Sequence, residues 1–150
     1  SNSYGEPLLQ DANCWDIVVN NLCLSAIKKN RIILKGDGSP LRDFIHYETI
    51  CDSVNNILNI DFDKEYNTIQ LSSGRSYSML ELAFIVKYLY IKRYNLNIEV
   101  YINNDELINK NVAIENNSII SNKYLNSKAP LKLFSMEEGI NRVFDYLELT

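Results

Sequence analysis

The sequence predicts one domain over residues 1–150, of the α/β class, or α+β when the chain is taken as an isolated piece. Segments with helical apolar spacing alternate with short β-branched runs, and no linker or internal repeat divides them. A hydrophobic fraction of 46% beside 23% charged residues is typical of a globular domain. A chain of this length can bury roughly 70% of its unfolded surface, so it is long enough to build its own core.

The first predicted element is a helix over residues 13–30. Apolar residues recur there with helical spacing, and Asp11 or Asn13 can serve as its N-cap. Residues 31–35 (RIILK) form a short β-branched run, which is typical of a strand. Turn formers fill residues 36–40 (GDGSP), so this strand is expected to end in a turn.

Extended chain resumes at residues 42–46 (RDFIH) and leads into a second helix. From residue 48 to residue 59 the apolar positions again repeat with helical period. Residues 68–71 (TIQL) alternate like a strand, and residues 72–76 (SSGRS) have the composition of a loop.

A capping box opens the longest predicted helix. Ser78 is followed three residues later by Glu81, and residues 79–94 carry one apolar face with basic residues near the end. Residues 98–102 alternate as in a half-buried strand, and the Asn-rich stretch 103–122 is predicted to be a loop with at most one short element. A second capping box, Ser135 with Glu138, precedes a final helix.

Charge and hydropathy exclude two classes of partner. The net charge is −4 and the isoelectric point is about 5.0, whereas a nucleic-acid footprint needs clustered Lys and Arg. No apolar run is long enough to span a bilayer, and the first residues lack the layout of a secretory signal. We therefore expect no nucleic acid, no membrane and a cytoplasmic location.

The cysteines support neither a metal site nor a disulfide framework. Cys14, Cys23 and Cys51 lack CxxC spacing, and only one histidine accompanies them. We expect three buried thiols and no bound metal.

Two short motifs mimic a dehydrogenase active site. The pairs Tyr88/Lys92 and Tyr124/Lys128 match Tyr-x-x-x-Lys, but about one such match is expected by chance in a chain with this many Tyr and Lys. A dinucleotide site also needs a glycine-rich turn between a strand and a helix, and the pair Gly36/Gly38 is followed by extended chain instead. We therefore assign no catalytic and no cofactor-binding residue.

Four blocks resemble a known family, in the family's order. Residues 1–5 (SNSYG) are similar to Arg-x-x-Asn-x-Tyr-Gly-Pro, and residues 36–47 (GDGSPLRDFIHY) are similar to Gly-x-Gly-x-x-x-Arg-Asp-Phe-Ile-His-Val. Residues 66–82 resemble Tyr-Asn-x-Gly-x-Gly…Ser-x-x-Glu-Leu, and residues 133–140 resemble a terminal Leu-x-x-Gly-Ile segment. These are motifs of extended short-chain dehydrogenases/reductases, the NAD-dependent epimerase/dehydratase family.

The resemblance implies that the chain is the C-terminal, substrate-binding portion of such an enzyme, with the last strand-helix-strand elements of its Rossmann-type fold. The N-terminal NAD-binding half, which carries the catalytic Tyr, Lys and Ser/Thr, would lie upstream. The parent would be an NAD(P)-dependent, homodimeric nucleotide-sugar epimerase, dehydratase or reductase of polysaccharide biosynthesis. The portion alone would bind no cofactor, be inactive and self-associate. The alternative is a stand-alone module that binds nucleotide sugars or a protein without catalysis.

The same resemblance implies three substrate-binding residues. Arg42 aligns with the arginine that holds the diphosphate of the sugar nucleotide, and its planar fork of donors suits two phosphate oxygens. Its alternative role is an ion pair with Asp43 or Glu48. Asn2 aligns with an asparagine that bonds sugar or phosphate, and Asn13 either contacts the ligand or caps the first helix.

His46 and two departures complete the prediction. His46 lies in an alternating strand, where a packed or hydrogen-bonded histidine is expected rather than a catalytic one. Residues 103–122 contain no second diphosphate-binding arginine, and residues 125–130 (LNSKAP) keep only the ends of the family's Leu-Gly-Trp-x-Pro segment. The sequence leaves the sugar and the nucleotide open.

Overall fold

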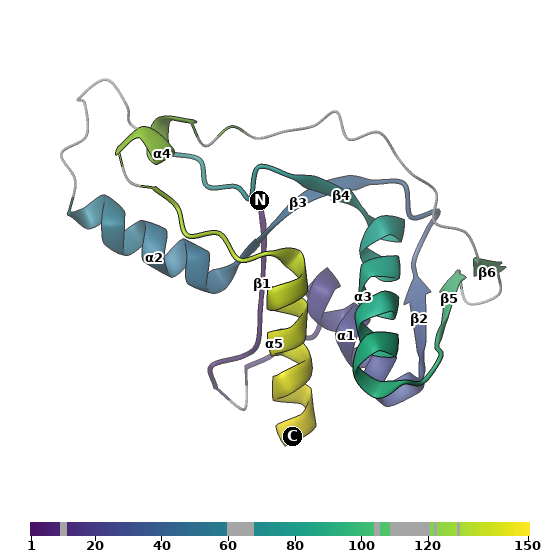
Figure 1. Ribbon diagram of the computed structural model, residues 1–150. Coiled ribbons are helices and arrows are strands. Elements are labelled where there is room, and N and C mark those ends of the chain that lie inside the picture. The colour runs from purple at the N-terminus through teal and green to yellow at the C-terminus, as the bar shows by residue number, and fades with distance from the viewer. Residues whose placement is uncertain (10–11, 60–67, 104–105, 109–120, 122, 129) are drawn as a thin grey trace.

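The computed structural model describes residues 1–9, 12–59, 68–103, 106–108, 121, 123–128 and 130–150. Helices and short strands alternate along these segments, which confirms the α/β class. The described strands form two sheets of three strands each, and helices cover them (Figure 1).

The first sheet has the order β1-β3-β4 and carries the family-like motifs. Strand β1 (Asn2–Tyr4) pairs in parallel with β3 (Leu41–His46), and β4 (Ser76–Ser78) pairs with β3 in antiparallel fashion. A parallel pair needs a long crossover, and the chain between β1 and β3 provides one through the first helix and the other sheet.

The second sheet has the order β2-β5-β6. Strand β2 (Arg31–Leu34) pairs in parallel with β5 (Glu99–Ile102), and β6 (Glu106–Ile108) adds an antiparallel edge. Alternating apolar residues of β2 and β5 point into the core, because every second side chain of a strand lies on the same face.

Three helices enclose the main core. Helix α1 (Val18–Lys29) packs against α3 (Met79–Tyr94) and α5 (Met136–Leu149), and α3 also covers β2 and β5 (Figure 1). Arg93 of α3 joins two carboxylates of α5, with distances of 2.5 Å to Asp145 and 2.7 Å to Glu148. The largest side chains under 2% exposed in this core are Phe144, Ile32, Leu82, Ile98 and Ile140.

The other two described helices lie outside this group. Helix α2 (Tyr47–Leu58) extends away from α1, α3 and α5 in Figure 1, and the short α4 (Lys123–Lys128) also lies outside this group. The buried residues of α2 are the polar Thr49 and Ser53, whereas its apolar Val54 and Leu58 are 47% and 79% exposed. The second predicted helix is therefore confirmed, but its packed face is not its apolar face.

Local capping signals predicted the starts of two helices correctly. Helix α3 spans the predicted residues, and the Ser135/Glu138 capping box at α5 is complete. At α3 only half of the predicted box forms: the Ser78 side chain accepts from the Glu81 amide at 3.0 Å, while the Glu81 carboxylate pairs with Arg75. An available arginine has drawn the carboxylate away from the backbone.

Two boundaries differ from the prediction. Helix α1 begins at Val18 with extended Ile17 at its N-cap, so Asn13 is not the cap. Tight turns occupy the preceding segment, where the amide of Ile17 donates to the carbonyl of Cys14 at 3.3 Å. Residues 68–71 form no strand, and the sheet takes residues 76–78 as its third strand instead.

The three cysteines do not share one environment. Cys23 is buried in α1, Cys14 is half-buried and Cys51 is exposed on α2, so the expectation of three buried thiols was wrong for Cys51. Among the described residues no group of His, Cys, Asp and Glu is placed to hold a metal ion. None of the described helices combines the length and apolar character needed to cross a bilayer.

Candidate functional site

The pairing of β1 with β3 brings two predicted site residues to one sheet. Asn2 lies opposite Phe44, two residues beyond Arg42 on β3. The Asn2 side-chain amide donates to the Asp43 carbonyl at 3.2 Å, which fixes its position at the strand edge. Arg42 and Phe44 share one face of β3, because side chains alternate along a strand.

Arg42 has an exposed guanidinium group. Its Nη1 donates to the carbonyl of the preceding residue, Leu41, at 2.9 Å. The two acids considered as ion-pair partners are engaged elsewhere, Asp43 by a loop and Glu48 by Arg142. Among the described residues, therefore, no carboxylate competes with a ligand for Arg42.

Asp43 anchors the loop beside this arginine. Its buried carboxylate accepts from the Ser73 amide at 3.0 Å, the Ser73 hydroxyl at 3.0 Å and the Gly74 amide at 3.1 Å. Gly74 has a φ of +77°, a conformation that glycine adopts without steric cost. The two adjacent residues therefore differ in role: the Arg42 side chain is exposed, whereas the Asp43 side chain holds the loop at Ser73 and Gly74.

A hollow of about 440 Å³ borders the same sheet. It is lined by β1, by Phe44 and by residues 16–18 at the start of α1, so Asn2 contributes to its wall. Arg42, two residues before Phe44 on β3, is not among the lining residues. Asn13 is exposed, five residues before α1, and is not among the lining residues. The structure places Arg42 and Asn2 on two paired strands of one sheet, and Asn13 lies in the segment before α1, outside that sheet.

His46, the last residue of β3, is the centre of a polar cluster. Its side chain is fully buried; Nε2 lies 3.2 Å from Glu6 Oε2, and Nδ1 accepts from the Glu48 amide at 3.3 Å as the N-cap of α2. This bond assigns the ring hydrogen to Nε2, which donates to Glu6. The Phe134 ring stacks on the imidazole with centroids 4.6 Å apart. The prediction of a packed, hydrogen-bonded histidine is confirmed.

Glu6 and Arg142 complete that cluster, and motif analysis had not singled them out. Arg142 Nη2 lies 2.6 Å from Glu6 Oε1 and also pairs with Glu48, while the Tyr47 hydroxyl donates to Glu6 at 3.2 Å. Burial together with the nearby Glu6 carboxylate raises the pKa of Tyr47 to about 12. The sequence separates Glu6 from Arg142 by most of the chain, so no local spacing could have joined them.

The His46 environment predicts a pH-dependent stability. Burial lowers the pKa of the imidazole below its usual 6.5, and the attraction of Glu6 offsets only part of that effect. The unfolded chain therefore takes up a proton more readily than the folded one. Stability is full above the unfolded pKa and is lost as the pH falls from about 6.5 towards the lower folded pKa.

Urea titrations at pH 7.5 and 5.5 test this expectation, because His46 is the only histidine in the chain. The wild type is expected to lose stability over this interval, whereas His46→Asn, which keeps a capping acceptor, is expected to lose much less. Equal losses in both proteins would assign the pH dependence to other groups.

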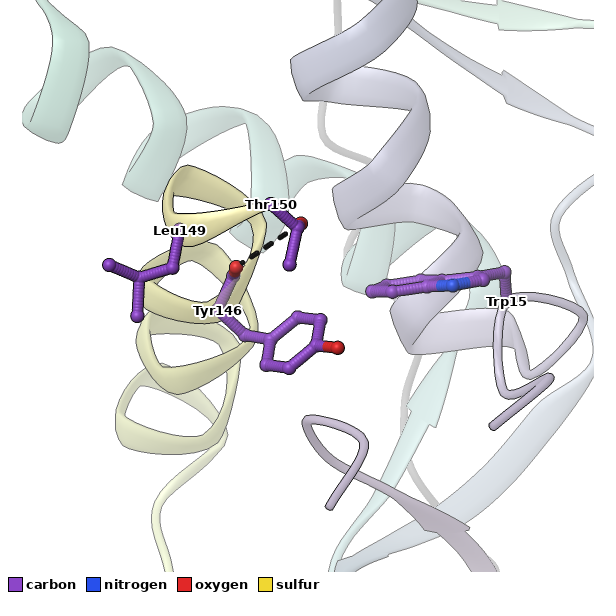
Figure 2. Close-up of a pocket in the computed structure, with 4 residues that line it drawn as sticks. All are labelled: Trp15, Tyr146, Leu149 and Thr150. Atoms are coloured by element: carbon purple, nitrogen blue, oxygen red, sulfur yellow. Dashed lines mark hydrogen bonds between the residues drawn. The ribbon is translucent and has the colours of Figure 1, made fainter. Parts of the chain in front are cut away.

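Another hollow, of about 420 Å³, lies near the last described residues. It is lined by Trp15, Tyr146, Leu149 and Thr150, and the two aromatic rings flank it (Figure 2). No predicted site residue contributes to it. Of the Tyr-x-x-x-Lys pairs, Tyr88 is 57% exposed and the Lys92 ammonium lies 5.8 Å from its ring centroid, as a surface pair.

Comparison with solved structures identifies the fold. An NAD-dependent NDP-hexosamine 5,6-dehydratase, TunA, involved in tunicamycin biosynthesis, matches 99% of this chain with a TM-score of 0.67 and 18% identity. WbmF of Bordetella bronchiseptica, solved with NADH, matches 99% with a TM-score of 0.70 and 16% identity. A UDP-glucose 4-epimerase of Thermotoga maritima, solved with UDP-glucose, matches 99% with a TM-score of 0.69 and 16% identity.

The chain has the fold of NAD-dependent epimerases and dehydratases. The family resemblance of the four sequence blocks is thus confirmed at the level of fold. The chain spans 44% of the length of each of these three proteins, so more than half of each of them has no counterpart in it. No protein-family model matches the sequence, and a search of curated proteins finds no match.

Proposed function

We propose that this chain is the C-terminal, nucleotide-sugar-binding portion of an NAD-dependent epimerase or dehydratase. The observation that carries the proposal is Arg42: an exposed guanidinium without a carboxylate partner among the described residues, on the strand that pairs with β1 and two residues before Phe44, the partner of Asn2. It stands in a fold that the Thermotoga maritima enzyme, solved with UDP-glucose, shares.

In this proposal Arg42 binds the diphosphate and Asn2 bonds the sugar or a phosphate oxygen. A guanidinium offers two parallel N–H donors to two phosphate oxygens, and a pair of this kind is stronger than a neutral hydrogen bond. The hollow between β1 and α1 would receive part of the ligand. Asn13 stays a weaker candidate, because it lies on neither β1 nor β3.

The hydride chemistry would come from the part of the protein that binds NAD. Nicotinamide cofactors oxidise and reduce a sugar carbon, and the protein supplies their binding and orientation. These 150 residues lack the glycine-rich turn that a dinucleotide requires, so they do not fit an NAD site by themselves. The role of this portion is to hold and orient the nucleotide sugar.

Calorimetric titration with UDP-, GDP-, CDP- and dTDP-sugars tests the assignment. One nucleotide class is expected to bind saturably, and Arg42→Ala is expected to weaken that binding by about tenfold to a hundredfold, since a charge-assisted hydrogen bond contributes about 1.5–3 kcal/mol. Arg42→Lys keeps the charge but loses the fork, so its affinity should fall between those of wild type and Arg42→Ala.

Arg31→Ala is the matched control, because Arg31 is an exposed arginine on the other sheet. Equal losses of affinity in Arg42→Ala and Arg31→Ala would mean that the effect comes from the net charge of the protein and not from a specific contact of Arg42. Absence of binding in a folded protein that carries an NAD-binding half would contradict the proposal. A gene product confined to these residues that binds nucleotide sugars would instead favour a stand-alone binding module.

A further inference from the structure

A second exposed arginine lies near Arg42, at the start of the neighbouring strand. Strands β3 and β4 pair in antiparallel register, and Arg42 lies directly opposite Tyr77. Residues that face each other in this way project their side chains from the same face of the sheet. The guanidinium carbon of Arg75 lies 4.5 Å from the centroid of the Tyr77 ring, as in a cation–π pair. Tyr77 therefore has one arginine opposite it on β3 and another over its ring.

The backbone of Arg75 is held by the residue that adjoins Arg42 on β3. The buried Asp43 carboxylate accepts from the Ser73 hydroxyl at 3.0 Å and from the Gly74 amide at 3.1 Å. The oxygen of the same Ser73 hydroxyl accepts from the Arg75 amide at 3.3 Å. One buried carboxylate thus links the strand that carries Arg42 to the turn that presents Arg75.

The charge of Arg75 is only weakly committed to another group. Its Nη2 lies 2.9 Å from Glu81 Oε1, and the Arg75 side chain is 59% exposed. An ion pair this exposed contributes little to stability, so a more highly charged anion can displace the Glu81 carboxylate at small cost. Arg42 has no carboxylate partner among the described residues, and like charges on neighbouring strands repel. A ligand with two negative charges would offset both guanidinium groups.

We propose that Arg42 and Arg75 bind the two phosphate groups of one diphosphate, one arginine to each group. This inference rests on the proposed function and adds a second binding residue to that site. The Tyr77 ring holds the Arg75 guanidinium in place, and Glu81 is its partner until the ligand binds. The arrangement favours a nucleoside diphosphate over a nucleoside monophosphate, because a single phosphate group leaves one of the two arginines without its ligand.

Calorimetric titration of the whole protein, as its gene encodes it, tests the pairing with UDP, GDP, CDP, dTDP and the four corresponding monophosphates. For the base that binds, Arg42→Ala and Arg75→Ala are each expected to weaken diphosphate binding at least about tenfold, the size of one charge-assisted contact. Monophosphate binding should fall in only one of the two variants, the one that removes the arginine next to the nucleoside. Unchanged diphosphate binding in Arg75→Ala would overturn the inference, and so would equal losses of monophosphate binding in both variants.

Two further variants control for charge and for folding. Lys92→Ala removes a positive charge from an exposed side chain of α3 whose ammonium lies 5.8 Å from the Tyr88 ring centroid, so it matches Arg75→Ala away from β3. A loss of affinity equal to that of Arg75→Ala would assign the effect to net charge and overturn the inference. Glu81→Gln frees Arg75 but keeps the Glu81 amide that Ser78 caps, and it should tighten diphosphate binding about twofold to threefold. A misfolded variant could not gain affinity in this way.

The same titrations separate this inference from the proposed function. Nucleotide binding that depends on Arg42 but is unchanged in Arg75→Ala overturns the two-arginine arrangement and leaves the proposed function in place. A folded wild-type protein that binds none of the eight nucleotides and no nucleotide sugar overturns the proposed function, and this inference with it.

Discussion

Gly5→Ala is expected to lower the free energy of unfolding by about 3–5 kcal/mol, the largest loss from adding one methyl group to this chain. Gly5 has a φ of +143°, a region open essentially to glycine alone. A Cβ atom there would lie 2.3 Å from Tyr47 Cδ1 and 2.9 Å from His46 Nε2. Backbone strain and overlap therefore add, each costing about 1–3 kcal/mol.

Two other glycines separate the two causes. Gly36 has a φ of +87° with no atom near its virtual Cβ, so Gly36→Ala measures backbone strain alone. Gly139 is helical, and its virtual Cβ lies 2.3 Å from the Tyr4 hydroxyl, so Gly139→Ala measures overlap, offset by the roughly 1 kcal/mol that alanine gains in a helix. Urea denaturation of the three variants should give the greatest loss for Gly5→Ala. A loss no larger than that of Gly36→Ala would show that Tyr47 and His46 move aside.

The helices could be predicted because their signals are local. Helix α3 begins at Ser78 and α5 at Ser135, where a hydroxyl satisfies a backbone amide within three residues. The start of α1 could not be predicted in the same way, since Asn13 has a capping side chain but the chain turns after it. The strand expected at residues 68–71 failed because pairing with β3, a long-range contact, selected residues 76–78.

The packed face of α2 shows a second limit. Apolar period predicts that a helix forms, and it also predicts that Val54 and Leu58 face a core. The helix forms, but its buried residues are Thr49 and Ser53. The Thr49 hydroxyl donates to the carbonyl of Lys132, and the Ser53 hydroxyl donates to the carbonyl of Thr49 within the helix.

The candidate site was predictable where it depended on a contiguous motif. The motif of residues 42–46 predicted that Arg42, Asp43 and His46 lie on one strand, and the structure shows that Arg42 is exposed and the other two are buried. The partners of the buried residues came from distant segments, Ser73 for Asp43 and Glu6 for His46. The family resemblance pointed to Arg42 as a candidate, and the fold determined which charged groups lie near each residue of the motif.

Asp43→Ala is expected to lower the free energy of unfolding by about 3 kcal/mol. The change removes a carboxylate that accepts from the Ser73 amide, the Ser73 hydroxyl and the Gly74 amide. Hydrogen bonds to charged groups contribute about 1.5–3 kcal/mol each. The net loss is smaller than their sum, because water can replace the carboxylate at some of these donors in the variant. Asp43→Asn keeps the shape and one acceptor oxygen, so it should lose less. Urea denaturation gives the free energies, and amide hydrogen exchange at Ser73 and Gly74 reports the loop directly.

Asp52→Ala is the matched control, because Asp52 is an exposed carboxylate on α2 and its loss should cost no more than about 0.5 kcal/mol. If Asp43 anchors the loop, exchange at Ser73 and Gly74 accelerates in Asp43→Ala and stays at the wild-type rate in Asp52→Ala. Similar stabilities for the two variants would mean that β3 and β4 hold the loop without the carboxylate. Under the proposed function the result also bears on binding, because an anchored Asp43 would hold β3, and with it the adjacent Arg42, in one position before the ligand binds.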